Sequence, residues 1–276
     1  MLLNFYDLFN ESRMADNCSH FRLKAKMSDV VIVAAKRTAI GNFNGSLSTV
    51  SAHDLAATVI KDLLADTCVQ GSDISEVILG QVLSAGHGQN PARQASIAGG
   101  LPDTVPAMGI NMVCGSGLRA VYVGAQAILN GDSNIVVAGG MENMSMSKHA
   151  MAARQGVKFG DVSLEDTMLK DGLTDAFHKY HMGMTAENIA NKYGITRLEQ
   201  DEYSVASQQK TGVAMSENWF KDEIVDVSVP GRKGAVIVNT DEFPRADTNV
   251  DSLSKLKPAF LRDGTGIKFM FIVYAL

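Results

Sequence analysis

Cys114 is the residue of this sequence whose surroundings best suit covalent chemistry. It lies in the run NMVCGSGL (residues 111–118), between an apolar segment and a segment with helical spacing. A cysteine at the start of a helix lies near unpaired backbone N–H groups and the positive end of the helix dipole, and both stabilise the attacking thiolate. The adjacent glycines would let a thioester carbonyl approach backbone amides that can stabilise its oxyanion. This pattern indicates nucleophilic acyl transfer.

The pattern around Cys114 leaves three alternatives open. Most free cysteines are small buried hydrophobic residues, so Cys114 could have only a packing role. The order strand–Cys–Gly–Ser–Gly–helix also suits a cysteine hydrolase or a ketoacyl synthase.

The segments that must position Cys114 predict alternating strands and helices. Short apolar runs that are typical of buried strands cover residues 30–35, 77–83, 105–113 and 135–138. Apolar residues recur at helical spacing over 55–64 and 118–129, and Asn90–Pro91 opens a further short helix. This order predicts an α/β layered fold with a largely parallel sheet.

Composition limits the classes of function. The 276 residues carry 25 basic and 30 acidic side chains, a net charge of -5, which argues against nucleic acid as a partner. Three scattered cysteines (Cys18, Cys68 and Cys114) are too few for a disulfide framework or a metal site, and free thiols favour a reducing compartment. No apolar stretch is long enough to span a bilayer, and residues 1–26 fit neither a secretory signal nor a mitochondrial presequence. We therefore expect no metal, no membrane association and a cytoplasmic location, with a mitochondrial one as the alternative.

Seven motifs together resemble the thiolase family and occur in that family's order. NMVCGSGLRAV (residues 111–121) resembles the family's acyl-enzyme motif. The six others are VVIVAAKRTAIG (30–41), GQNPARQA (88–95), GGMENMS (139–145), GLTDAFHKYHMGMTAE (172–187), GRKG (231–234) and KLKPAF (255–260). The resemblance covers residues 28–266 and is specific for the biosynthetic branch, the acetyl-CoA C-acetyltransferases that form acetoacetyl-CoA. GQNPARQA and GGMENMS argue against a ketoacyl synthase.

The resemblance implies the N-terminal half of a thiolase-like layered αβαβα fold, with an inserted loop domain. In this interpretation residues 1–27 are a loosely ordered extension, and residues 28–140 form the N-terminal α/β domain. Residues 141–248 form a loop domain that binds CoA, and residues 249–266 return to the N-terminal domain. The apolar residues 267–276 do not resemble the family.

The resemblance also implies roles for individual residues. Cys114 would take an acyl group from acyl-CoA, and a second acetyl-CoA, deprotonated at its α-carbon, would attack that thioester. Leu173, His181 and Met182 match residues that line the pantetheine and acyl tunnel. Residues that fall where the family contacts the nucleotide end of CoA are Arg245, Thr248 and Ser252.

Several of these assignments have a purely structural alternative. His181 could be a hydrogen-bonded loop histidine, Met182 a core residue, and Arg245 a solvated charge. His87 lies between two glycines and has the side chain of a general base. It is not assigned a role, because the family has no catalytic residue at that position.

The implied reaction condenses two molecules of acetyl-CoA to acetoacetyl-CoA, or runs in reverse as thiolysis. Coenzyme A is the substrate carrier, no metal or organic cofactor is needed, and a homo-oligomer (dimer or tetramer) is expected. The family's second α/β domain, which supplies a general-base histidine and a second cysteine, has no counterpart in this sequence. We therefore expect a truncated thiolase with low activity. The alternative is a catalytically impaired form that binds CoA or full-length subunits.

Overall fold

The computed structural model describes residues 2–5 and 30–266, which divide into two compact units. The first unit comprises Met1–Lys148 and Glu223–Thr240, and the second comprises His149–Asp222 and Asp241–Leu276, as far as these residues are described.

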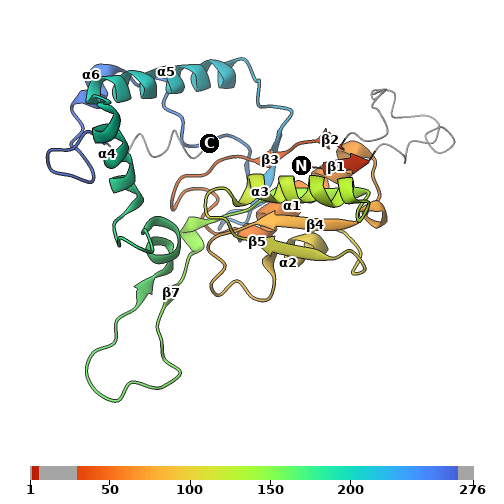
Figure 1. The fold of residues 1–276 in the computed structure, drawn as a ribbon. Helices are drawn as coiled ribbons and strands as arrows, with labels where there is room; N and C mark the ends of the chain where they lie inside the picture. Colours follow the sequence, from red (N-terminus) through yellow and green to blue (C-terminus); the bar gives the residue numbers. More distant parts are fainter. Residues whose placement is uncertain (1, 6–29, 267–276) are drawn as a thin grey trace. The chain divides into compact units, whose positions relative to one another are not determined.

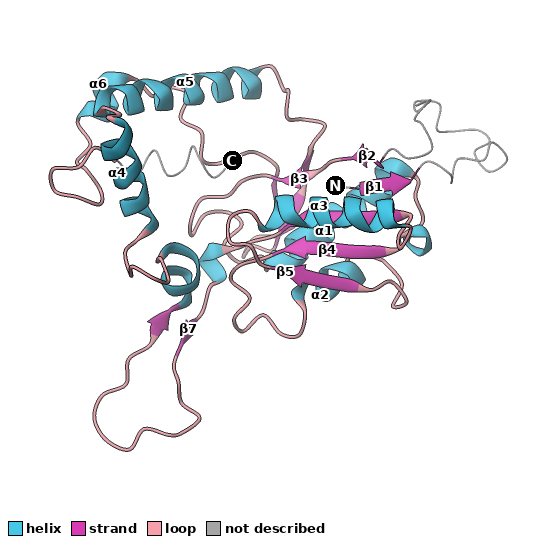
Figure 2. Cartoon of the chain, viewed as in Figure 1, coloured by secondary structure: helices cyan, strands magenta, loops and turns pink. Residues whose placement is uncertain are grey.

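A five-stranded sheet forms the centre of the first unit (Figures 1 and 2). Its order is β2-β1-β6-β4-β5, where β4 pairs in parallel with both β5 and β6, and β1 runs antiparallel to both β2 and β6. The strands are β1 (Leu2–Phe5), β2 (Val30–Ala34), β4 (Glu76–Gly80), β5 (Ala107–Ile110) and β6 (Ile135–Gly140).

Three helices cover the two faces of this sheet: α1 (Ala52–Thr67), α2 (Pro91–Ala98) and α3 (Ser116–Asn130). Successive residues of a strand point to opposite faces, and β4 shows this alternation. Val77 and Leu79 pack in one cluster with α1 and α2, whereas Ile78 packs in another with α3. The predicted α/β layered fold is confirmed, with helices on both faces of the sheet.

Local signals in the sequence set the helix boundaries. The Ser51 side chain accepts a hydrogen bond from the Asp54 N–H and caps α1, and the Asn90 side chain does the same for Arg93 at the start of α2. The helix α3 ends at Gly131, whose φ of 81° lies in the left-handed region that favours glycine.

A second small core in the first unit joins residues that are far apart in the sequence. The short strand β3 (Arg37–Thr38) pairs in parallel with β9 (Ile224–Val225), and β10 (Val227–Val229) pairs antiparallel with β11 (Val236–Val238). Val227, Val229 and Val238 are buried together with Leu55 of α1. These apolar contacts place Glu223–Thr240 in the first unit.

The two compact units differ from the expected domains at three places. We expected all of residues 141–248 to form the loop domain, but the valine contacts above assign Glu223–Thr240 to the first unit. Residues 249–266 were expected to return to the N-terminal domain, yet they group with the second unit. The expected loose extension over 1–27 contains Leu2–Phe5, which is paired on both edges as β1. The rest of that extension and the tail 267–276 lie outside the described residues.

The second unit is mainly helical. Its helices are α4 (Met182–Tyr193), α5 (Arg197–Ser216), the short α6 (Val250–Ser254) and a π-helical segment (Met168–Leu173), next to the paired strands β7 (His149–Ala150) and β8 (Glu165–Asp166). Arg197 pairs with Asp201 at 2.9 Å and donates to the backbone oxygen of Leu253, which ties α5 to α6. None of the helices in the described ranges has the length and apolar character that crossing a bilayer would require.

Candidate active site

Cys114 lies in the turn between β5 and α3. The strand ends at Ile110, Gly115 is the N-cap of α3, and Cys114 directly precedes that N-cap. The predicted position at the junction of a strand and a helix is confirmed. Cys114 is exposed in the described chain, so the alternative of a buried packing residue is wrong. Its chemical role stays a prediction.

Backbone strain and side-chain hydrogen bonds fix the shape of this turn. Val113 has a φ of 49°, a conformation that β-branched residues rarely adopt and that costs of order 1–3 kcal/mol. The Asn111 side-chain oxygen accepts from the Val113 N–H at 2.9 Å. Ser116, which is only 4% exposed, accepts from the Met112 N–H at 2.8 Å and donates to the Val113 oxygen at 2.6 Å. Val113, the residue before Cys114, is therefore held by hydrogen bonds at both its N–H and its carbonyl oxygen.

The strain at Val113 leads to a testable result. We expect Val113→Gly to be more stable than Val113→Ala by about 1 kcal/mol, because glycine adopts positive φ without the steric cost that alanine pays. Val113 is 47% exposed, so both variants lose a similar, small amount of buried surface. Urea unfolding of the two variants measures the difference. An alanine variant as stable as the glycine variant would show that Val113 is not in this conformation in solution.

Close packing on two strands holds the first turn of α3 in place. A Cβ atom at Gly80 in β4 would lie 2.4 Å from the carbonyl carbon of Ser116 and 2.6 Å from the nitrogen of Gly117. At Gly140 in β6, a Cβ would lie 3.2 Å from the Cα of Gly117. Gly80 was not predicted to support the site. Its position inside an apolar strand run was the available signal, because such glycines often mark a close backbone approach.

Gly80→Ala is expected to displace the turn that carries Cys114. The added methyl group meets backbone atoms, so the start of α3 must shift, at a cost of about 1–3 kcal/mol in stability. We expect the rate of Cys114 alkylation by iodoacetamide to change and any acyl transfer to fall at least roughly tenfold. Gly109→Ala in β5 is the matched control, since its Cβ would meet only the Leu79 oxygen at 3.9 Å. Equal behaviour of the two variants would contradict this account.

Two titratable groups in the described part of the first unit have shifted pKa values. Burial, together with the nearby Lys148 and His53, lowers the pKa of His87 below its ordinary value. Burial raises the pKa of Glu142, although its carboxylate accepts hydrogen bonds from the backbone N–H groups of Val82 at 2.9 Å and Leu83 at 3.3 Å. A lowered pKa favours the neutral imidazole of His87, the form that suits a base, but no contact in the described chain connects it to Cys114.

The three residues predicted to line the pantetheine tunnel lie together in the second unit. Leu173 ends the π-helical segment, His181 is the N-cap of α4, and Met182 is its first residue. An isolated bridge between Thr174 and His181 brings the two ends of this loop side by side. His181 Nδ1 accepts from the Gly183 N–H at 3.0 Å, which supports the structural alternative for this residue. Its ring also stacks on Phe260 at 5.1 Å between centroids.

The three residues predicted to contact the nucleotide lie on one segment that leads into α6. The Thr248 N–H donates to the Arg245 oxygen at 3.0 Å, and Thr248 is buried. Arg245 is exposed. The Ser252 N–H is bonded to the Asn249 side chain at 2.9 Å, and its hydroxyl donates to the Asn249 oxygen at 2.7 Å. The structure thus brings the six predicted CoA-binding residues into two groups of the second unit, while Cys114 belongs to the first unit.

Comparisons with known proteins agree with the site motifs. Residues 30–267 match the family model described as "Thiolase, N-terminal domain". The chain is 58% identical to the acetyl-CoA acetyltransferase of Chromobacterium violaceum, over 86% of this chain and 61% of that protein. It is 55% identical to the cytosolic acetyl-CoA acetyltransferase of Rattus norvegicus, over 88% of this chain and 62% of that protein. The crystal structure of the Bacillus anthracis acetyl-CoA acetyltransferase matches with a TM-score of 0.82 and 39% identity, covering 85% of this chain and 60% of that one. The chain therefore spans about three fifths of the length of these relatives.

Proposed function

The chain belongs to the thiolase family, and from this membership we propose that it accepts an acetyl group from acetyl-CoA on Cys114. The observation that carries the proposal is the exposed Cys114 on a braced turn directly before α3. The full reaction proposed is the condensation of two molecules of acetyl-CoA to acetoacetyl-CoA, and its reverse. The relatives named acetyl-CoA acetyltransferase support this substrate.

The first half-reaction is a transfer between two thiols. The Cys114 thiolate attacks the carbonyl carbon of acetyl-CoA, the bond from that carbon to the CoA sulfur breaks, and CoA leaves as a thiolate that takes up a proton. The N–H groups of Gly115 and Ser116 already donate within the turn, to the oxygens of Met112 and Val113, each at 3.1 Å. Oxyanion stabilisation by the start of α3 would therefore use the next amides, those of Gly117 and Leu118.

The second unit is proposed to bind CoA. Leu173, His181 and Met182 would contact the pantetheine and acyl part, and Arg245, Thr248 and Ser252 the nucleotide. An exposed arginine suits this role, because a guanidinium pairs with phosphate through two hydrogen bonds and stacks on adenine. The proposed chemistry needs no metal or organic cofactor. A homo-oligomer in the cytosol is proposed with it, and the rat relative is named as cytosolic.

Exchange of label between free CoA and acetyl-CoA tests the proposal, because it needs only the first half-reaction. We expect labelled CoA to enter acetyl-CoA at a rate proportional to the protein concentration. No exchange by the wild-type chain would overturn the role of Cys114.

The condensation rate, measured in parallel, tests the expectation of low activity. Exchange with little condensation would indicate that the acyl-accepting step works alone. Binding of CoA with neither activity would favour the catalytically impaired form, and mixing with a full-length thiolase would then show whether the chain joins its subunits.

A further inference from the structure

Ser116 connects the helix that follows Cys114 with the residues that precede it. It is the first residue of α3, and its hydroxyl accepts from the Met112 N–H at 2.8 Å and donates to the Val113 oxygen at 2.6 Å. The Ser116 N–H donates to the same Val113 oxygen at 3.1 Å. Both partners of the hydroxyl precede Cys114 in the chain, so these hydrogen bonds close a short loop of backbone that contains the cysteine.

This loop holds Val113 in a backbone conformation that valine rarely adopts. Its φ of 49° is sterically unfavourable for a β-branched residue and persists only where the surrounding contacts over-determine it. Burial does little of this work, because Val113 is about half exposed. Three side-chain hydrogen bonds act on the backbone of Met112 and Val113: two come from Ser116 and the third from Asn111. The Ser116 hydroxyl is therefore the main restraint on the residue that leads into Cys114.

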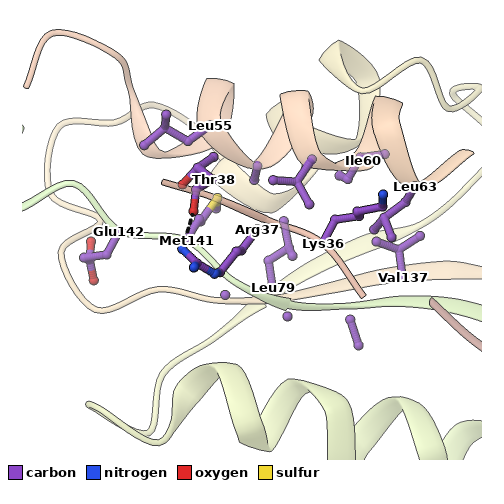
Figure 3. A pocket seen from close by; sticks show the side chains of 15 residues that line it. Lys36, Arg37, Thr38, Leu55, Ile60, Leu63, Leu79, Val137, Met141 and Glu142 are labelled. Atoms are coloured by element: carbon purple, nitrogen blue, oxygen red, sulfur yellow. Dashed lines mark hydrogen bonds between the residues drawn. The ribbon is translucent and has the colours of Figure 1, made fainter. Parts of the chain in front are cut away.

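Packing on β4 restricts the Ser116 side chain itself. Ser116 is buried, and a Cβ at Gly80 would lie 2.6 Å from its Cβ, so the serine packs directly on the backbone of that strand. The other face of the same strands is less filled in the described chain. There α1 covers a cavity of about 200 Å³ that the backbone of residues 138–140 helps to line (Figure 3). The close contacts that fix the turn are thus on the α3 face, where Ser116 lies.

We propose that Ser116 is a positioning residue for acyl transfer at Cys114: its hydroxyl holds Val113 at positive φ, and this conformation places the thiol for attack on the thioester. The inference rests on the proposed function of Cys114. Ser116 acts only through the backbone, because its hydroxyl is buried and already bonded on both sides of its oxygen. A serine that merely stabilised the start of α3 would affect unfolding, but not the reactivity of the folded chain.

A double-mutant cycle with Val113 tests this role through the exchange of label between CoA and acetyl-CoA. We expect Ser116→Ala to lower the kcat of exchange about tenfold or more and to leave the KM for acetyl-CoA within about twofold, since the thiol is displaced while CoA binding is not. Glycine adopts positive φ without the steric cost. In a Val113→Gly chain the hydroxyl is therefore dispensable, and the same serine change is expected to cost less than about threefold. Equal losses in the two backgrounds would overturn the proposal.

Ser133→Ala is the matched control. Ser133 is also a buried serine of the first unit, and its hydroxyl donates to Glu76 Oε1 at 2.6 Å, away from the turn. We expect this variant to lose stability much as Ser116→Ala does, but to keep its exchange rate within about twofold of the wild type. If Ser116→Ala also lost only stability and kept its exchange rate, the role of Ser116 would be structural and the proposal would be wrong.

Alkylation by iodoacetamide, followed on the peptide that contains Cys114, separates this inference from the proposed function because it needs no acetyl-CoA. At a fixed pH, we expect Ser116→Ala to change the alkylation rate about threefold or more, and less than about twofold in the Val113→Gly background. A wild-type chain without label exchange but with this alkylation pattern would refute acyl transfer and keep the positioning of the thiol by Ser116. Identical alkylation in all four chains would overturn the positioning.

The cycle remains decisive if Ser116→Ala alone does not fold. The double variant carries no strain at residue 113, so it is expected to fold and to exchange label at a rate close to that of Val113→Gly. A double variant that also fails to fold, or that loses about tenfold relative to Val113→Gly, would show that Ser116 does not act through Val113.

Discussion

Cys114→Ala is expected to abolish the exchange of label between CoA and acetyl-CoA, with a loss on the order of 1,000-fold or more. Alanine removes the sulfur that forms the new thioester, and no neighbouring group in the turn can replace it. The side chains of the turn that bond the backbone, Asn111 and Ser116, are already engaged in holding Val113. The variant should fold as the wild type does, because Cys114 is exposed.

Cys68→Ala is the control for this result. Cys68 is the other exposed cysteine in the described chain, and it lies at the C-cap of α1 rather than before a helix. We expect its exchange rate to stay within about twofold of the wild type, since a residue away from the reacting atoms contributes little to the transition state. An equal loss in both variants would mean that the reaction is not specific to Cys114. Residual exchange in Cys114→Ala near the wild-type rate would rule out the acyl-enzyme.

Glu187→Ala is expected to be the most destabilising single change in the second unit, by about 3 kcal/mol. Glu187 lies in α4 and is 2% exposed. One carboxylate oxygen accepts from the Thr265 N–H at 2.9 Å and the other from the Gly266 N–H at 2.8 Å. Alanine would leave the half-buried Thr265 N–H and the buried Gly266 N–H without the carboxylate that accepts their hydrogen bonds.

Denaturant unfolding followed by circular dichroism measures the effect. Glu202→Ala is the matched control, because Glu202 is an exposed glutamate within α5. We expect that variant to stay within about 0.5 kcal/mol of the wild type, as surface substitutions usually do. A Glu187→Ala variant as stable as the control would contradict the buried hydrogen bonds.

The sequence predicts well those helices and strands whose positions depend on local signals, such as buried apolar runs and capping residues. The buried runs of β4 and β6 alternate correctly between the two helical layers, and capping residues such as Ser51 and Asn90 mark the helix starts. The position of Cys114 before α3 follows from the same kind of signal, since glycine and serine after an apolar run indicate a turn into a helix.

Features that depend on distant residues could not be predicted. Leu2–Phe5 has no signal that distinguishes a central strand from a loose extension, and its partners in β6 are more than 130 residues away. Glu223–Thr240 joins the first unit only because its valines pack on Leu55 and neighbouring residues. Glu187 resembles the solvent-facing glutamates of an amphipathic helix until its two backbone partners are known.

The candidate active site also combines features with local sequence signals and features that depend on distant residues. The motif around Cys114 predicts a reactive cysteine, but not that Ser116 holds the preceding residue or that Gly80 supports the helix start. His181 was predicted from its motif as a ligand-binding residue, and the structure adds a capping role for its Nδ1.

Peptide mapping by mass spectrometry tests the central claim most directly. The chain would be incubated with acetyl-CoA that carries an isotope-labelled acetyl group, digested under mildly acidic conditions that preserve thioesters, and analysed peptide by peptide. We expect one labelled acetyl group on the peptide that contains Cys114, released by neutral hydroxylamine, and none on the peptide that contains Cys68. Label on both cysteines to the same extent, or on neither, would contradict the proposal that Cys114 is the acyl acceptor.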